Sequence, residues 1–168
     1  MHCHCEVVIP DNGAIKEHVE RAMAPFREAA GFNAEFDFDW YQIGGRYTGS
    51  KDGYAPESDP RNIEICDQCR GTGIRDDVLG RQARSRDPAY TCNGCDGKGN
   101  RVAWPTKWVK HDGDVIPVVA VPDDLKAYAL ILPNGEILVQ KQWDGNVATA
   151  LRARGITTGR IVTVDCHS

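Results

Sequence analysis

The feature that most constrains the fold is an eight-residue pattern, C-x-x-C-x-G-x-G, that occurs twice in the chain. The copies run from Cys66 to Gly73 and from Cys92 to Gly99. Two cysteines three positions apart can close a tight turn on one metal ion, and a second such pair completes a shell of four thiolates. The glycines suit a backbone that turns sharply with positive φ. Because a full shell leaves no position for water, we predict one structural zinc ion bound by Cys66, Cys69, Cys92 and Cys95.

The alternative interpretation is that the two pairs are unrelated redox dithiols or disulfides. Repetition of the whole eight-residue unit favours zinc over this alternative. The chain has seven cysteines, an odd number, which fits a reduced thiol inventory better than a disulfide framework. The first residues lack the basic start and the apolar stretch of a secretory signal, and no apolar run is long enough to span a membrane. We therefore expect a cytoplasmic protein with no membrane partner.

From about Ile63 to Val102 the sequence resembles the cysteine-rich zinc domain of the DnaJ (Hsp40) chaperones, whose signature is the same repeat. In that family four repeats make two zinc sites, whereas this chain has two repeats and resembles a single site with its connecting hairpin. The resemblance implies the zinc fold and makes a protein client a candidate partner. It does not extend to recruitment of Hsp70, because the chain has neither the His-Pro-Asp tripeptide of a J domain nor a Gly/Phe-rich linker.

The segment around the cysteines carries positive charge within an acidic chain. Residues 61–110 contain ten basic and six acidic residues, about +4, and the remainder contains ten basic and eighteen acidic residues, about −8. An anionic partner such as a nucleic acid could bind there. The alternative is a solvated hairpin whose arginines have no partner. The candidate contacts lie between the two cysteine pairs and are Arg75, Arg81, Arg84 and Arg86.

The segments on either side of the insertion are predicted to be halves of one domain, residues 1–60 and 103–168, interrupted by a zinc-binding hairpin at residues 61–102. Alternating apolar residues predict strands at 2–10, 34–43 and 160–167. A helix is predicted from about Ile15 to Phe26, a hairpin turns at Asn134-Gly135, and a short helix covers residues 147–154. This order indicates an α+β fold with a small, mostly antiparallel sheet, helices on one face and a ferredoxin-like topology as a candidate.

Polar residues alternate with apolar ones in both the first and the last predicted strand. If the two strands are neighbours, one face of the sheet collects several imidazoles and carboxylates. Such a set could bind a second metal ion or perform acid–base chemistry. The alternative is that these residues are exposed on a solvated face, with Cys3, Cys5 and Cys166 in the core. The residues concerned are His2, His4, Glu6, Asp165 and His167.

A second dense cluster, residues 37–47, combines carboxylates, aromatic side chains, two glycines and an arginine. Together with the last strand it predicts a ligand site at Asp39, Arg46, Asp165 and His167. In that site Arg46 would hold an anion and His167 would act as general base or metal ligand. The alternative places the aromatic side chains in the core and pairs Arg46 with Asp39.

Both halves also resemble a family of uncharacterised bacteriophage and actinobacterial proteins. Its members carry Asp-Trp-Tyr-x-Ile-Gly-Gly-Arg early in the chain and Val-Asp-Cys-His at the end, as found here at 39–46 and 164–167. The resemblance implies a single split domain into which the zinc repeat was inserted, and it implies no reaction.

Two functions follow from the sequence. The first is a zinc-stabilised interaction module that binds a protein or a nucleic acid, encoded by a phage and acting in the host cytoplasm. The alternative is an enzyme or small-ligand-binding protein that uses the site at Asp39, Arg46, Asp165 and His167. No nucleophile elbow, phosphate-binding loop, dinucleotide fingerprint or His-Glu-x-x-His sequence is present to support catalysis.

Overall fold

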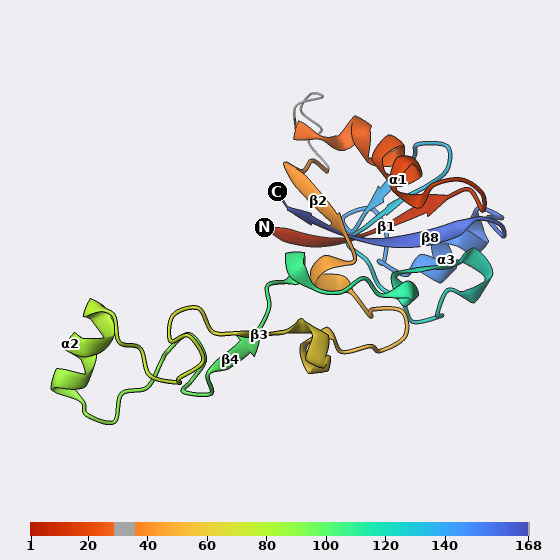
Figure 1. Cartoon of the computed structure of the whole chain (residues 1–168). Helices are drawn as coiled ribbons and strands as arrows, with labels where there is room; N and C mark the ends of the chain where they lie inside the picture. The colour runs from red at the N-terminus through yellow and green to blue at the C-terminus, as the bar shows by residue number, and fades with distance from the viewer. Residues whose placement is uncertain (29–35, 168) are drawn as a thin grey trace. The chain divides into compact units, whose positions relative to one another are not determined.

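The computed structural model describes residues 1–28 and 36–167 of the 168-residue chain. The chain divides into two compact units (Figure 1). Residues 1–54 and 110–168 form the first, which we call the sheet unit, and residues 55–109 form the second, which we call the cysteine unit. The chain therefore leaves the sheet unit once and returns to it, and the predicted insertion at 61–102 lies within the cysteine unit.

The sheet unit is built on a mixed sheet of six strands. Five strands lie in the order β2-β8-β1-β6-β7, and β5 also pairs with β8. All neighbouring pairs are antiparallel except β1 and β6, which are parallel. The α+β class with a mostly antiparallel sheet is confirmed. The strands are β1 (His2–Ile9), β2 (Trp40–Ile43), β5 (Val115–Pro117), β6 (Ala129–Ile131), β7 (Ile137–Val139) and β8 (Arg160–His167).

The first and last strands form the centre of this sheet. They pair along their whole lengths, so that His2 lies opposite His167 and Ile9 lies opposite Arg160. The odd-numbered residues of β1 from Cys5 to Ile9 are buried in one core, as their alternation predicts. The prediction that the two ends of the chain are sheet neighbours is therefore confirmed.

Two helices pack on opposite faces of the sheet (Figure 1). Helix α1 (Ile15–Met23) buries Val19 in the same core as Val7 of β1. Helix α3 (Val147–Ala153) buries Leu151 in a second core with Val8. Because successive side chains of a strand point to opposite faces, these two cores lie on different sides of β1. The prediction of helices on one face, and with it the ferredoxin-like arrangement, is wrong.

Other local predictions for this unit have mixed outcomes. Strands β6 and β7 flank the Asn134-Gly135 turn, so the hairpin is confirmed. The strand predicted at 34–43 is β2 in its last four residues, while positions 34 and 35 lie outside the described residues. Short 3-10 helices connect the elements of both units: η1 (Ala24–Phe26), η3 (Gly45–Tyr47), η4 (Pro56–Ser58), η5 (Pro60–Asn62), η6 (Pro105–Lys107), η7 (Asp112–Asp114) and η8 (Val118–Ala120).

The cysteine unit contains a two-stranded antiparallel sheet of β3 (Ile63–Ile65) and β4 (Asn100–Val102). Between the two cysteine pairs lies helix α2 (Val78–Arg86), where the sequence predicts only a connecting hairpin. The Asp77 carboxylate caps this helix by accepting a hydrogen bond from the Gly80 amide at 2.8 Å. None of the helices in the described ranges combines the length and apolar character needed to cross a bilayer.

Candidate metal centre

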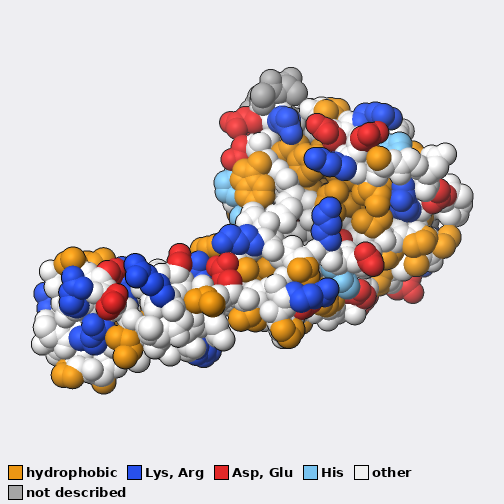
Figure 2. Space-filling model, in the orientation of Figure 1, with side chains coloured by type: hydrophobic (Ala, Val, Ile, Leu, Met, Phe, Trp, Pro, Cys, Tyr) orange, Lys and Arg blue, Asp and Glu red, His pale blue; other side chains and the backbone are white. Residues whose placement is uncertain are grey.

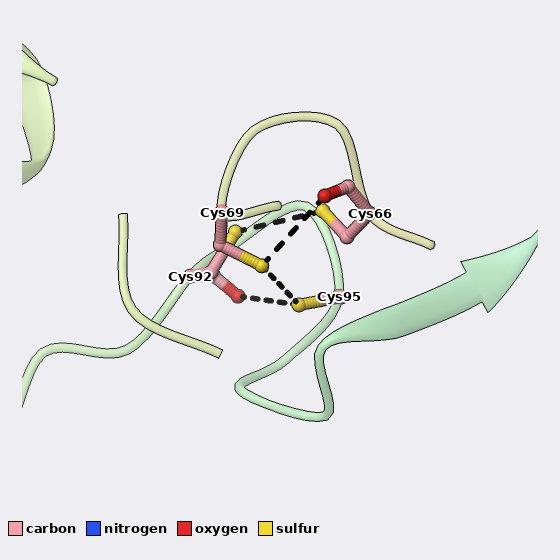
Figure 3. A group of neighbouring side chains, drawn as sticks. All are labelled: Cys66, Cys69, Cys92 and Cys95. Carbon is pink, nitrogen blue, oxygen red and sulfur yellow. Dashed lines mark hydrogen bonds between the residues drawn. The ribbon is translucent and has the colours of Figure 1, made fainter. Parts of the chain in front are cut away.

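The four cysteines of the two repeats point toward a common centre (Figure 3). All four are buried, and their sulfur atoms lie within 4.8 Å of one another. The Sγ atoms of Cys66 and Cys92 are 3.8 Å apart, and those of Cys69 and Cys95 are 3.6 Å apart. A tetrahedron with zinc–sulfur bonds of about 2.3 Å has edges of about 3.8 Å, whereas a disulfide would bring two sulfurs to about 2.05 Å. The spacing therefore fits four thiolates around one ion.

The two repeats hold each other in place through reciprocal backbone contacts. The Cys66 amide donates to the carbonyl of Gly99 at 2.9 Å, and the Cys92 amide donates to the carbonyl of Gly73 at 2.8 Å. The last glycine of each repeat also lies against the other repeat, so closely that a Cβ atom at Gly73 would be 2.3 Å from the Gly97 oxygen. A Cβ atom at Gly99 would likewise be 2.3 Å from the backbone oxygen of Gly71. The last glycine of each copy is thus required by packing.

Positive φ angles recur at matching positions of the two copies. Arg70 and Asp96, which directly follow the second cysteine of each pair, have φ of 52° and 49°. Gly71 and Gly97 follow with φ of 86° and 76°. This left-handed backbone turns an amide N–H group toward a cysteine sulfur: the Gly99 amide donates a hydrogen bond to Cys95 Sγ at 3.2 Å. The prediction that the glycines serve a sharply turning backbone is confirmed.

The environment of the thiols favours ionisation at one position and opposes it at another. Burial raises the pKa of Cys69, but hydrogen bonds from the Gly73 amide, from Cys95 and from the Gly71 amide outweigh it and lower the pKa to about 7. At Cys92 burial dominates and raises the pKa to about 12. Four thiolates in so small a volume repel one another, so a bound cation is needed to keep all of them ionised.

The four arginines predicted to contact an anionic partner are mostly engaged within the cysteine unit. Arg75 forms an ion pair with Asp77 at 2.8 Å. Arg81 donates to the backbone carbonyl of Asp76, and Arg84 donates to that of Arg75. Arg86 is exposed at the end of α2. Three of the four arginines, Arg75 before α2 and Arg81 and Arg84 within it, therefore make contacts inside this segment.

The polar residues at the two chain ends share one face of the sheet, as their alternation predicts, but the two carboxylates of β1 and β8 on this face are not solvated. Glu6 and Asp165 are 0% and 1% exposed. Each imidazole binds a different carboxylate: His2 contacts Asp165 at 2.8 Å, His4 contacts Glu6 at 2.8 Å and His167 contacts Asp39 at 2.9 Å. The alternative of a solvated sheet face is therefore wrong for Glu6 and Asp165, whereas its placement of Cys5 and Cys166 in the core is confirmed.

Within residues 1–28 and 36–167, the four cysteines are the one group of three or more His, Cys, Asp or Glu side chains whose ligand atoms are close enough to share an ion. The histidines and carboxylates at the chain ends do not form a second such group. They form three separate pairs instead.

The predicted ligand site at Asp39, Arg46, Asp165 and His167 is only partly assembled. Asp165 accepts a hydrogen bond from the backbone amide of Arg46 at 3.0 Å, while the Arg46 residue is exposed. Asp39 pairs with His167 rather than with Arg46, and this hydrogen bond holds the pKa of Asp39 below its usual range. The four residues thus form two pairs, Arg46 with Asp165 through a backbone amide and Asp39 with His167 through an ion pair.

A buried ion pair that the sequence did not reveal lies beside these residues. Lys51 Nζ is 2.9 Å from Glu6 Oε2, and both side chains are almost fully buried. The same ammonium donates to the Thr163 hydroxyl and to the carbonyl of Asp114. Burial raises the pKa of Asp114, although the Gly49 amide and the Thr48 hydroxyl donate to its carboxylate. No local pattern marks Lys51, which follows a glycine-rich turn and reaches β1 and β8 only in three dimensions.

Comparison with known proteins finds no matching family model, no matching curated protein and no matching solved structure.

Proposed function

We propose that the protein is a zinc-stabilised interaction module whose cysteine unit binds a protein partner. The observation that carries the proposal is the distribution of exposed apolar side chains. Of ten large hydrophobic residues exposed in the described structure, seven lie in the cysteine unit. Figure 2 shows apolar atoms interspersed with basic side chains on this unit. The seven residues are Ile63, Ile65, Ile74, Val78, Leu79, Val102 and Trp104.

The metal explains how the unit can expose these residues and still fold. The buried hydrophobic cluster of this unit consists of Cys66, Cys69, Cys92 and Cys95. A segment with so small an apolar core depends on metal ligation for its folding free energy. A zinc tetrathiolate would supply it and leave the large apolar side chains free for a partner. The DnaJ-like repeat supports the same proposal, since a single-site module of that kind is a rigid scaffold for contact.

Charge favours a protein over a nucleic acid as the partner. Residues 55–109 contain nine Lys or Arg and eight Asp or Glu residues, a difference of +1. Four thiolates around Zn²⁺ add a charge of −2, so the loaded unit is close to neutral. Nucleic-acid binding depends on a marked excess of positive charge. Exposed apolar residues at the centre of a patch are instead typical of protein interfaces.

The test is capture of partners from lysate by the immobilised full-length protein, with quantification of every captured species. We expect Val78→Ser with Leu79→Ser to abolish capture of the principal partner, because both side chains are about 60% exposed and contribute little to folding. Cys92→Ser should lose both zinc and capture. The matched control is Val119→Ser in the sheet unit, which changes a valine that is 80% exposed and should leave capture unchanged.

Three outcomes would contradict the proposal. They are equal capture by metal-free protein, equal capture by the Val78/Leu79 variant, and capture only of nucleic acid with a steep loss in salt. The last result would instead support the alternative of an anion-binding insertion.

A further inference from the structure

Two histidines from opposite ends of the chain face each other at the end of the sheet unit. His2 of β1 and His167 of β8 are directly paired in the antiparallel register. Their ring centroids are 5.0 Å apart, and the rings meet at an interplanar angle of 72°. Side chains directly opposite each other on one face of a sheet are the closest cross-strand neighbours. The fold therefore fixes two imidazoles side by side although 164 positions separate them in sequence.

Each of these imidazoles is oriented by a carboxylate at the same ring nitrogen. His2 Nδ1 lies 2.8 Å from Asp165 Oδ1, and His167 Nδ1 lies 2.9 Å from Asp39 Oδ1. An ionised carboxylate only accepts hydrogen bonds, so Nδ1 carries the proton and donates it. The neutral ring then has its lone pair on Nε2. This carboxylate–histidine arrangement is the one that orients and strengthens imidazole ligands in metal proteins.

Trp40 restricts the positions of both rings. Its indole stacks on His167 with centroids 5.5 Å apart and an interplanar angle of 10°, and it meets His2 edge-on at 5.5 Å. The imidazoles remain accessible, since the side chains of His2 and His167 are 23% and 36% exposed. A site that is already ordered loses little conformational entropy when it binds an ion.

We infer that His2 and His167 form a two-imidazole site for a divalent transition-metal ion, separate from the cysteines. Imidazole nitrogen suits Ni²⁺, Cu²⁺ and Zn²⁺, and the two supporting carboxylates balance the charge of a dication. His2 and His167 supply one Nε2 ligand each, and water completes the coordination. Asp39 and Asp165 are positioning residues. The inference is independent of the proposed function of the cysteine unit.

The remaining described histidines of the sheet unit differ in chemistry. His4 uses Nε2 to contact Glu6 and stacks on Tyr47 with centroids 4.7 Å apart. His18 uses Nε2 to contact the Asn12 carbonyl, and His111 uses Nε2 to contact the Asp52 carboxylate at 2.6 Å. In all three, the nitrogen that is left for metal at His2 and His167 is already engaged. His18→Ala is therefore a matched control that removes an imidazole from the same unit.

The test is equilibrium dialysis of the zinc-loaded full-length protein against Ni²⁺, followed by metal analysis. We expect one Ni²⁺ per chain in addition to zinc. His2→Ala and His167→Ala should each lose this ion while keeping the zinc content and the circular dichroism of the wild type, and His18→Ala should keep it. Asp39→Asn should weaken binding by about tenfold or more, as expected for loss of a carboxylate that orients a ligand. Absence of Ni²⁺ binding by the wild type, or full binding by His167→Ala, would overturn the inference.

A second measurement applies even if a histidine variant fails to fold. Bound Ni²⁺ quenches the fluorescence of a nearby tryptophan, and Trp40 is the tryptophan in contact with both rings. We expect quenching in the wild type and much less in Trp40→Phe at the same Ni²⁺ stoichiometry. Equal quenching in the two proteins would place the ion elsewhere and overturn the inference.

Discussion

Glu6 and Lys51 form the most unusual pair of residues in the sheet unit, because both charges are removed from water. Burial of an ion pair costs several kcal/mol per ion, and the pair is tolerated only when additional hydrogen bonds satisfy both partners. Here the Thr163 hydroxyl donates to Glu6 at 2.9 Å and the carbonyl of Asp114 accepts from Lys51 at 3.0 Å. The pair therefore joins the loop that contains Lys51 to both central strands.

Removal of one partner should be far more damaging than removal of an exposed charge. Lys51→Met keeps most of the side-chain volume but leaves the Glu6 carboxylate buried without its ammonium. We expect the free energy of unfolding to fall by about 3–5 kcal/mol. Urea unfolding followed by circular dichroism measures it. Lys16→Met, on an exposed position of α1, should change it by less than about 0.5 kcal/mol, and similar losses in the two variants would contradict the buried pair.

The same pair should make stability depend on pH in a defined direction. Burial opposes ionisation of Glu6, but the Lys51 ammonium and the hydrogen bond with His4 outweigh it, so the pKa of Glu6 lies below its ordinary value of 4.5. A carboxylate of this kind stabilises the fold above the unfolded pKa, and its contribution is lost as the pH falls through the folded pKa. The stability difference between the wild type and Glu6→Gln should therefore be largest near pH 7 and should shrink below pH 4.5. Urea unfolding of both proteins from pH 7 to pH 3 tests this, and a difference that stays constant would contradict it.

Alanine substitutions at two glycines can distinguish the stability cost of a steric clash from the stability cost of a positive φ angle. Gly45 has φ of 58°, and a Cβ atom there would lie 2.5 Å from the Cβ of Asp165. Gly53 has φ of 75°, but a Cβ atom there would meet no atom within 4 Å. We expect Gly53→Ala to cost about 1–2 kcal/mol of unfolding free energy from backbone strain alone. Gly45→Ala should cost clearly more in thermal unfolding, and an equal loss would show that η3 does not press against β8.

At the scale of elements, the two cysteine repeats form one structure because the backbone of each repeat packs against the glycines of the other. Gly71 and Gly73 have similar φ angles of 86° and 74°, but they differ in packing. A Cβ atom at Gly73 would be 2.3 Å from a backbone oxygen, whereas one at Gly71 would be 3.4 Å from the Ile65 side chain. We expect Gly73→Ala to weaken zinc retention in a competition with a chelator much more than Gly71→Ala. Equal retention would contradict the packing role of the second glycine.

The elements that the sequence predicted correctly are those with a strong local pattern. The cysteine repeat, the alternation in β1 and β8 and the Asn134-Gly135 turn each encode their structure within a few residues. Helix α2 was missed because its residues carry few apolar side chains, although Asp77 before Val78 and the arginines of its last turn are helix-end signals. The face of the sheet on which each helix packs depends on long-range packing, and no short pattern reports it.

The candidate sites also divide into those that a local sequence pattern reveals and those that depend on tertiary structure. Spacing alone identified all four cysteines, because their chemistry is local. The polar residues of β1 and β8 were correctly placed on one face, but the burial of Glu6 and Asp165 was not foreseen. Lys51 and Tyr47 contact that face from a turn and from η3, and the sequences of these segments contain no periodic signal. Burial of a polar face is thus a property of tertiary structure, and a single sequence does not encode it in a readable pattern.

At the scale of the whole molecule, the two units differ in what holds them together. The sheet unit has two apolar cores, one on each side of its sheet, whereas the buried cluster of the cysteine unit is the four thiols themselves. The central claim is therefore that one zinc ion per chain maintains the fold of residues 55–109 and that the sheet unit folds without it.

Hydrogen exchange with mass spectrometry, performed on the zinc-loaded protein and after removal of metal under reducing conditions, tests this claim most directly. We predict one zinc per chain and a loss of amide protection after chelation throughout β3, α2 and β4. Protection in β1 and β8 should remain unchanged in the same sample. Equal protection of the cysteine unit with and without metal, or a purified protein in which these cysteines are disulfides and no metal is bound, would contradict the account.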